Sequence, residues 1–254
     1  MTITTLDLNC DMGESYGAWR MGDDAAVLPL VSSANIACGF HGGDPGTMRQ
    51  TVALALQHGV ALGAHPSLPD LAGFGRRVMQ LSPQEAYDAV VYQIGALAGV
   101  AASQGARLHH VKAHGALYNM AARDPALAQA ICAAVRDVDP DLVLYGLAGS
   151  AWIDQGHAAG LRVAQEVFAD RSYQDDGSLT ARNQPGAMIT DAAQAVAQVL
   201  QMVREGTVTS VSGKRVRLRA DTLCIHGDQP GAAGFARAIG QALRAAGVAI
   251  RAVA

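Results

Sequence analysis

The chain has 254 residues, half of them hydrophobic, and a formal net charge of −3 at pH 7. This length fits one α/β barrel domain over residues 1–254, and the hydrophobic half can build a large core. Charges of both signs are interspersed without a basic patch, which excludes the electrostatic footprint of a nucleic-acid-binding protein.

Short apolar runs that predict strands alternate with helix-like stretches along the whole chain. The expected strands span residues 3–9, 34–38, 61–65, 108–112, 142–146, 162–167 and 222–226. The expected helices span residues 23–30, 45–58, 82–104, 125–135, 150–159, 191–205 and 231–246. Two helix starts carry strong signals: Asp44 is an N-cap before Pro45, and Ser82 opens a capping box that Glu85 completes.

This alternation predicts a parallel sheet with right-handed crossovers. Seven strand–helix units, with polar residues at most strand ends, favour a (β/α)7-type barrel over an open doubly wound sheet. One segment breaks the pattern, because residues 207–219 alternate with period two around Ser212 and Gly213. We expect an inserted β-hairpin there.

The sequence also predicts where the protein is found. Its four cysteines have no metal-ligand pair spacing and are expected to be reduced thiols that fill small apolar spaces; they are Cys10, Cys38, Cys132 and Cys224. The first five residues lack the pattern of a signal peptide, and no apolar run is long enough to span a bilayer. We therefore expect a cytoplasmic protein without a membrane partner.

Polar side chains gather at the ends of the expected strands, where parallel barrels build their active sites. Asp11 follows the first strand and suits a metal ligand or a general base. The glycine-bearing turn at 40–45 offers backbone amides to an anion, with His41 and Asp44 beside it. Asp44 can equally be the cap of the following helix.

Basic residues follow the third and fourth strands. His65 precedes a long polar loop in which Arg76 and Arg77 could hold a carboxylate or phosphate, or simply be solvated. Lys112 is one of only two lysines among 19 basic residues, which hints at a need for a compact ammonium. It could stabilise an oxyanion or phosphoryl group, and His114 could move protons.

Further polar residues follow the later strands. His226 and Asp228 precede a helix start and could bind an anion, whereas Glu166, Asp170 and Arg171 suit either a structural ion pair or catalysis. The neighbours His109 and His110 lie inside a strand and are expected to be structural. The chain has no Gly-x-x-x-x-Gly-Lys-Ser/Thr loop, no Gly-x-Gly-x-x-Gly after a strand and no Gly-x-Ser-x-Gly elbow.

Six segments together resemble the LamB/YcsF family. They are DLNCDMGE at 7–14, SANIACGFHGGDP at 33–45, GAHPS at 63–67, VKAHGALYN at 111–119, FADR at 168–171 and CIHGD at 224–228. The resemblance covers nearly the whole chain, in order. One departure is Ala113, where the family usually has proline before the histidine.

The resemblance implies a barrel akin to those of glycoside hydrolases and polysaccharide deacetylases. It also implies ATP-dependent opening of 5-oxo-L-proline (pyroglutamate) to L-glutamate, in complex with two further 5-oxoprolinase subunits, B and C. Because the chain lacks a phosphate loop, we expect ATP to bind mainly on these partners, and this chain to hydrolyse a lactam that they have activated.

Under this hypothesis the candidate catalytic residues are Asp11, His41, His65, Lys112 and His114. Asp11 would be the general base or orient water, Lys112 would stabilise the oxyanion or phosphate, and the histidines would handle protons or a metal. The candidate substrate-binding residues are Asn9, Asp44, Arg76, Arg77, Tyr118, His226 and Asp228.

Two alternatives stay open. The first is a stand-alone metal-dependent amidohydrolase or deacetylase, since Asp11, His41 and His65 are residue types that hold a divalent metal ion. The second is a non-catalytic subunit that only binds substrate, against which the dense set of titratable strand-end residues argues. The sequence leaves open whether a metal is bound.

Overall fold

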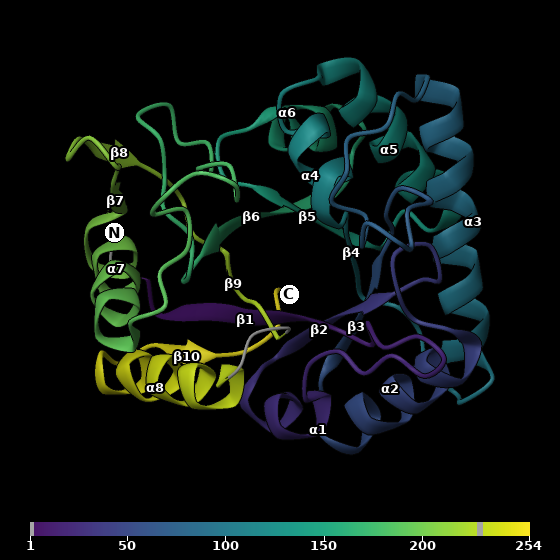
Figure 1. Ribbon diagram of the computed structural model, residues 1–254, viewed down its shortest axis with the longest axis horizontal. Coiled ribbons are helices and arrows are strands. Elements are labelled where there is room, and N and C mark those ends of the chain that lie inside the picture. The colour runs from purple at the N-terminus through teal and green to yellow at the C-terminus, as the bar shows by residue number, and fades with distance from the viewer. Residues whose placement is uncertain (1–2, 228–230) are drawn as a thin grey trace.

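The computed structural model describes residues 3–227 and 231–254 and forms a closed barrel ringed by helices (Figure 1). The strands of the barrel are parallel in the order β1-β2-β3-β4-β5-β6-β9, and β9 pairs back with β1 to close the barrel. They are β1 (Thr5–Met12), β2 (Ser33–Ala37), β3 (Ala61–His65), β4 (His110–Lys112), β5 (Val143–Leu147), β6 (Arg162–Phe168) and β9 (Thr222–Ile225). The predicted (β/α)7-type barrel is confirmed.

Helices cover the outside of the barrel (Figure 1). They are α1 (Asp24–Val27) with the 3-10 turn η1 (Leu28–Leu30), α2 (Pro45–Gln57), α3 (Pro83–Ala102), α5 (Pro125–Val138), α6 (Ala151–Ala158), α7 (Ala192–Glu205) and α8 (Ala232–Ala245). Two elements were not expected from the sequence: the short helix α4 (Gly115–Ala121), and strand β10 (Ala249–Ile250), which pairs with the start of β1.

Both predicted helix starts are confirmed. The Asp44 carboxylate accepts the backbone N–H groups of Gly46 and Thr47 at 2.9 and 3.1 Å, capping α2. Ser82 Oγ accepts the N–H of Glu85 at 3.2 Å, while the Glu85 carboxylate accepts the N–H of Ser82 at 2.7 Å. These caps satisfy donors that would otherwise lack intrahelical partners.

Strand β1 runs further than the sequence pattern indicated, reaching Met12 instead of ending at residue 9. Because side chains alternate along a strand, Leu8 and Cys10 pack into the hydrophobic layer while Asn9 and Asp11 face the barrel interior. The two polar residues therefore stand on the strand itself.

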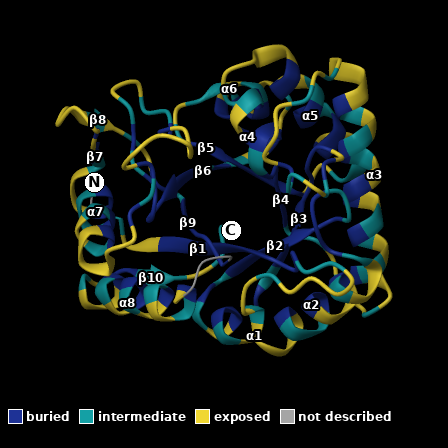
Figure 2. Ribbon diagram, in the orientation of Figure 1, coloured by how far each residue is buried: buried dark blue, intermediate teal, exposed yellow. Residues whose placement is uncertain are grey.

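The strands of the barrel are largely buried (Figure 2), and polar side chains are among the buried residues. At its base, the Asp7 carboxylate accepts hydrogen bonds from Ser33 Oγ at 2.8 Å and Thr222 Oγ1 at 2.6 Å, and Ser33 lies 3.3 Å from the hydroxyl of Tyr145. Burial raises the pKa of Asp7, which these hydroxyl donors partly counter. Side chains fill the barrel, and each polar group at this level has a partner.

The inserted hairpin is confirmed as β7 (Thr207–Thr209) paired antiparallel with β8 (Arg215–Arg217) at one side of the barrel (Figure 1). The four cysteines are free thiols and all are buried, as expected. None of the helices within the described residues is long and apolar enough to cross a membrane.

Candidate active site

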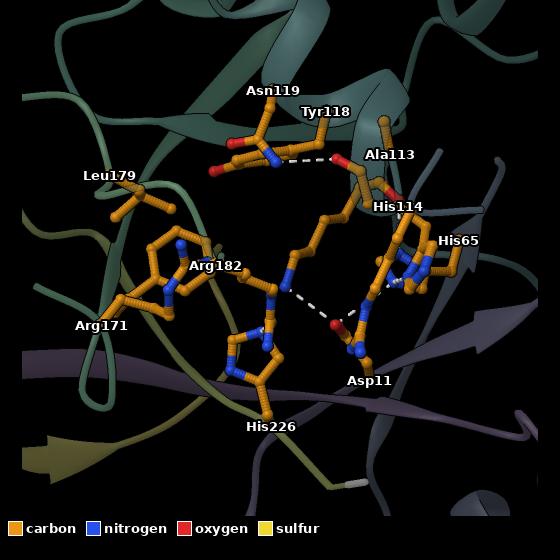
Figure 3. Close-up of a pocket in the computed structure, with 14 residues that line it drawn as sticks. Asp11, His65, Ala113, His114, Tyr118, Asn119, Arg171, Leu179, Arg182 and His226 are labelled. Carbon is orange, nitrogen blue, oxygen red and sulfur yellow. Dashed lines mark hydrogen bonds and ion pairs between the residues drawn. The ribbon is translucent and has the colours of Figure 1, made fainter. Parts of the chain in front are cut away.

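A pocket opens at the carboxyl ends of the barrel strands (Figure 3). Strand ends supply its floor, and the loops after β3 and β6 together with helix α4 supply its rim. The residues that line it include Asp11, His65, Arg76, Lys112, His114, Tyr118, Asn119, Phe168, Arg171, Leu179, Arg182 and His226.

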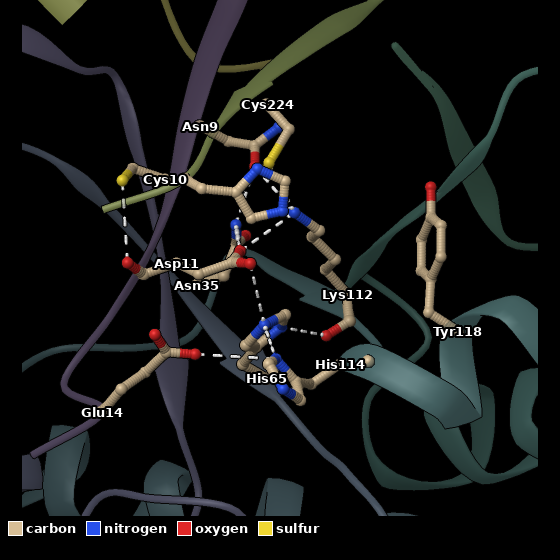
Figure 4. Close-up of polar contacts among 12 residues, drawn as sticks. Asn9, Cys10, Asp11, Glu14, Asn35, His65, Lys112, His114, Tyr118 and Cys224 are labelled. Carbon is tan, nitrogen blue, oxygen red and sulfur yellow. Dashed lines mark hydrogen bonds and ion pairs between the residues drawn. The ribbon is translucent and has the colours of Figure 1, made fainter. Parts of the chain in front are cut away.

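Lys112 lies at the centre of the floor and is buried (Figure 4). Its Nζ is 2.9 Å from Asp11 Oδ1, 2.9 Å from Glu166 Oε1 and 3.0 Å from Cys224 Sγ. Burial by itself lowers the pKa of Lys112, but Asp11, Cys224 and Glu166 raise that pKa well above its ordinary value. These contacts favour the ammonium form of the side chain.

Asp11 is held by three groups from different strands. Its Oδ1 accepts from Lys112 and from Asn35 Nδ2 at 2.9 Å, and its Oδ2 lies 3.3 Å from His65 Nε2. Burial alone raises the pKa of Asp11, yet His65 and Lys112 hold that pKa well below its usual range. Asp11 is thus an ionised carboxylate at the bottom of the pocket.

A second set of residues orients the floor from below. Asn35 Nδ2 also donates to Asn9 Oδ1 at 2.7 Å, and His110 Nε2 donates to Asn35 Oδ1 at 2.8 Å. His110 stacks on Tyr145 with ring centroids 4.2 Å apart, and burial keeps its pKa well below the ordinary value. His110 is a neutral supporting residue, in line with the structural role expected for it.

Three histidines and a glutamate form a compact group beside the floor. Figure 4 shows three of the four, Glu14, His65 and His114. The rings of His41 and His114 stack 3.8 Å apart, His114 Nδ1 lies 3.0 Å from His65 Nε2, and His41 Nε2 lies 3.3 Å from Glu14 Oε1. Burial lowers the pKa of both His41 and His114 well below the ordinary value. These four residues form a group that could hold a metal ion.

The rim of the pocket is basic. The Arg76 guanidinium lies 4.8 Å from the centre of the Phe74 ring, and Arg171 donates to the backbone carbonyls of Thr180 and Ala187. Burial, with Arg182 nearby, lowers the pKa of Arg171 to about 10, so it stays charged at neutral pH. With Lys112 on the floor, this rim suits an anionic ligand.

Most of the residues predicted from the sequence meet in this region. The predicted catalytic set lies together, and Asn9, Arg76, Tyr118 and His226 adjoin it. Tyr118 Oη donates to Glu166 Oε2 at 2.7 Å. His226 Nδ1 lies 2.7 Å from the Asp170 carboxylate, and its Nε2 faces Arg182 (Figure 3).

Two predicted residues in the described part of the chain do not line the pocket and are engaged elsewhere. Asp44 caps α2 and also accepts the backbone N–H of Gly17 at 2.9 Å. Arg77 is 68 % exposed and pairs with Asp70, its Nε donating at 2.9 Å. Asp228 lies outside the described residues.

The sequence pattern did not single out Arg182, and it left Glu14, Glu166 and Arg171 without an assigned role. Arg182 stands in the long segment between β6 and α7, so no strand end marked it. Cys224 was expected to be a small filler, yet its thiol accepts a hydrogen bond from Lys112 at 3.0 Å. Burial raises the pKa of this thiol well above its ordinary value, so it is not a nucleophile at neutral pH.

Relatives and solved structures match the chain over nearly its whole length. The chain is 77 % identical over 247 residues to a protein named as the A subunit of 5-oxoprolinase from Bordetella pertussis, covering 97 % of this chain and 98 % of that protein. A crystal structure of the lactam utilization protein from Thermus thermophilus is 53 % identical, with a TM-score of 0.92, and the match covers 98 % of this chain and 99 % of that one.

A more distant solved structure shares the fold alone. The T48 deacetylase is 12 % identical with a TM-score of 0.50, over 99 % of this chain and 89 % of that one. The model of the LamB/YcsF family matches residues 6–254. From this match and the close relatives we conclude that the chain belongs to the LamB/YcsF family.

Proposed function

We propose that the chain is the A subunit of an ATP-dependent 5-oxoprolinase, which opens 5-oxo-L-proline to L-glutamate in the cytoplasm together with subunits B and C. The names of the relatives support this proposal, because they designate one subunit of a multi-subunit enzyme. The observation that carries it is the ionised Asp11 between Lys112 and His65, at the floor of a pocket with a basic rim.

The substrate explains the need for ATP. A five-membered lactam is a resonance-stabilised amide with little ring strain, so attack by water is slow. Phosphorylation of the lactam oxygen makes the carbonyl carbon more electrophilic. Since this chain has no Gly-x-x-x-x-Gly-Lys-Ser/Thr loop, ATP is bound mainly by the partners, and this subunit hydrolyses the activated lactam.

Such a substrate carries a carboxylate and a phosphoryl group, and the pocket offers cations for both. Arg76, Arg171 and Arg182 line the pocket and present guanidinium groups suited to oxyanions. Lys112 stays an ammonium because Asp11, Cys224 and Glu166 surround it. It stabilises the negative charge that develops when water adds to the carbonyl carbon.

Asp11 has the role of orienting that water. Its pKa lies well below the usual range, which makes it a weak proton acceptor but a strong hydrogen-bond acceptor. Opening the ring then breaks the bond between the carbonyl carbon and the ring nitrogen, which takes up the protons of the attacking water and becomes the amine. The carbon then carries an acyl phosphate, which a second water cleaves to the carboxylate of glutamate and inorganic phosphate. His65 and His114 line the pocket and are candidates for moving those protons, whereas His41 stacks on His114 and does not line the pocket.

Glutamate release from 5-oxo-L-proline tests the proposal. The purified chain is assayed alone and with subunits B and C, each with and without ATP. Turnover that needs both the partners and ATP is the expected result. Turnover by the chain alone without ATP would instead favour a stand-alone amidohydrolase, and full turnover by complexes with substitutions on the pocket floor would favour a subunit that only binds substrate.

A further inference from the structure

The hydrogen bonds of two histidines determine which of their ring nitrogens carry a proton. His65 Nδ1 lies 2.7 Å from the backbone oxygen of Lys112, and His114 Nε2 lies 2.9 Å from the backbone oxygen of Phe74. A carbonyl oxygen only accepts hydrogen bonds, so these two nitrogens are the donors. The remaining nitrogens, His65 Nε2 and His114 Nδ1, face each other at 3.0 Å, so they either share one proton or both turn a lone pair toward a metal ion.

A carboxylate and a third histidine ring approach the same point. Glu14 Oε1 lies 3.5 Å from His114 Nδ1 and 3.3 Å from His41 Nε2. His41 is 1 % exposed, and neither of its ring nitrogens has a hydrogen-bond partner among the described residues. Ring nitrogens that face one another in a buried site need a proton or a metal ion between them.

We propose that Glu14, His41, His65 and His114 together bind one divalent transition-metal ion of the Zn²⁺ type. One atom from each residue can be chosen so that all four lie within 4.8 Å of one another. A tetrahedral zinc ion with ligands at about 2.0–2.1 Å separates neighbouring ligand atoms by roughly 3.3 Å. The separations of 3.0, 3.3 and 3.5 Å are close to that spacing, and rotation of the His41 ring out of its parallel stack on His114 would turn a His41 nitrogen toward the same ion.

The surroundings also match those of a metal site. Metal-binding histidines usually donate their second ring N–H to a carbonyl or carboxylate, which orients the ring toward the ion. The backbone oxygens of Lys112 and Phe74 do this for His65 and His114. Three imidazoles and one carboxylate are a donor set that zinc accepts.

A second group of potential metal ligands lies in the pocket, but it suits a metal ion less well than the first group does. Asp11, Cys224 and His226 also lie close together, but Lys112 Nζ is 2.9 Å from Asp11 Oδ1 and 3.0 Å from Cys224 Sγ. The Lys112 ammonium already supplies the positive charge between these residues. Both ring nitrogens of His226 are also engaged, one with Asp170 and the other with Arg182.

The proposed site forms one wall of the pocket and does not depend on the reaction proposed above. His65 and His114 line the pocket, whereas Glu14 and His41 do not. His65 Nε2 is also 3.3 Å from Asp11 Oδ2. A bound ion would place a positive charge beside Asp11 and hold both rings in one orientation.

Metal content and spectroscopy of the full-length chain test this site. The protein is stripped with a chelator and incubated with Zn²⁺ or Co²⁺; after removal of excess metal, ions per chain and the Tm are measured. We expect one ion per chain, a higher Tm, and a Co²⁺ spectrum with the intense visible bands of tetrahedral nitrogen and oxygen ligands. In E14Q and H41Q, Zn²⁺ affinity should fall about 10-fold or more. His157→Gln, an exposed histidine on α6, is the matched control and should bind as the wild type does.

Several outcomes would overturn the site. Absence of stoichiometric uptake of either ion, with an unchanged Tm, would mean that a shared proton holds the histidines together. Undiminished affinity in H41Q, or a thiolate-to-cobalt charge-transfer band, would place the ion elsewhere, near Cys224. If E14Q or H41Q fails to fold, the stoichiometry and Co²⁺ spectrum of the wild type decide the question.

Discussion

Asp11 on β1 and Lys112 on β4 are 101 positions apart in the chain, yet their side chains meet at 2.9 Å on the floor of the pocket. Lys112 also contacts Glu166 at the same distance. Burying these charges costs free energy, which the mutual attraction offsets only while each partner is present. The floor is therefore sensitive to removal of any one member.

Lys112→Met tests this sensitivity. Methionine keeps the length of the side chain but leaves Asp11 and Glu166 facing each other without a cation. We expect the free energy of unfolding to fall by about 3–5 kcal/mol in urea titrations, and glutamate release by the assembled complex to be lost. Lys214→Met, at the exposed turn of the hairpin, is the control and should change neither. A stable and active Lys112→Met protein would show that turnover does not require Lys112.

Asp11→Asn tests whether the carboxylate acts on water. The amide keeps the size of the side chain but loses the negative charge, so we expect turnover with subunits B and C and ATP to fall on the order of 100-fold or more. Asp124→Asn is the matched control, because asparagine also caps a helix and Asp124 caps α5 at the surface. Full turnover by Asp11→Asn would exclude this role.

Arg76 and Arg77 were equal candidates for holding the substrate carboxylate, and the structure separates them. Arg76 lines the pocket, whereas Arg77 pairs with Asp70. We expect Arg76→Met to raise the KM for 5-oxo-L-proline by roughly 10-fold or more, since a charge-assisted hydrogen bond is lost, and Arg77→Met to leave the KM unchanged. The reverse pattern would assign the substrate to Arg77.

Asp44 gives a prediction about pH. The N–H of Gly17, followed by the backbone and hydroxyl of Thr47, lowers the pKa of Asp44 from 3.8 to about 2. A carboxyl whose pKa is lower in the folded state adds stability above its unfolded pKa and loses it as the pH falls through the folded value. Asp44→Ala should thus be less stable than wild type by about 1 kcal/mol at pH 7. Urea titrations should show the difference shrinking as the pH falls from 3.8 toward 2; a constant difference would contradict this account.

Gly63 on β3 approaches the ring of His110 inside the barrel. A Cβ at this position would overlap His110 Nε2 and push the ring away from Asn35. We expect Gly63→Ala to cost about 1–3 kcal/mol of stability and to lower turnover, because Asn35 also holds Asp11. The same change at Gly95, exposed on α3 with open space around it, should instead raise stability by up to ~1 kcal/mol. Thermal unfolding of the two variants tests whether the first lowers the Tm and the second raises it.

The sequence could predict that the side chains of the pocket floor lie close together, because strand ends meet on one face of a parallel barrel. Asp11, His65 and Lys112 each stand in an apolar strand pattern, so their position in sequence implied their position in space. The end of β1 was predicted too early, since Asn9 and Asp11 interrupt the apolar run and resemble the start of a loop. Inside the barrel they are satisfied by Asn35, Lys112 and Glu166.

The rest of the site depends on tertiary packing. Arg182 comes from a segment without strand periodicity and reaches the pocket through its contact with His226. Glu14 follows β1 after a turn at Gly13, where φ is +67°, and only the packed structure brings it to His41. The partners of Arg77 likewise follow from the fold of its loop, because Asp70 also accepts the N–H of Gly73.

The polar interior of the barrel has a consequence for how the strands align during folding. A shift of β1 by one residue would turn Leu8 and Cys10 into the interior and move Asp7 and Asn9 into the apolar layer under the helices. Their partners Thr222, Asn35 and Ser33 would then lose their hydrogen bonds. A one-residue misalignment of this strand would bury an unpaired carboxylate, so the same network that supports the pocket also disfavours that register.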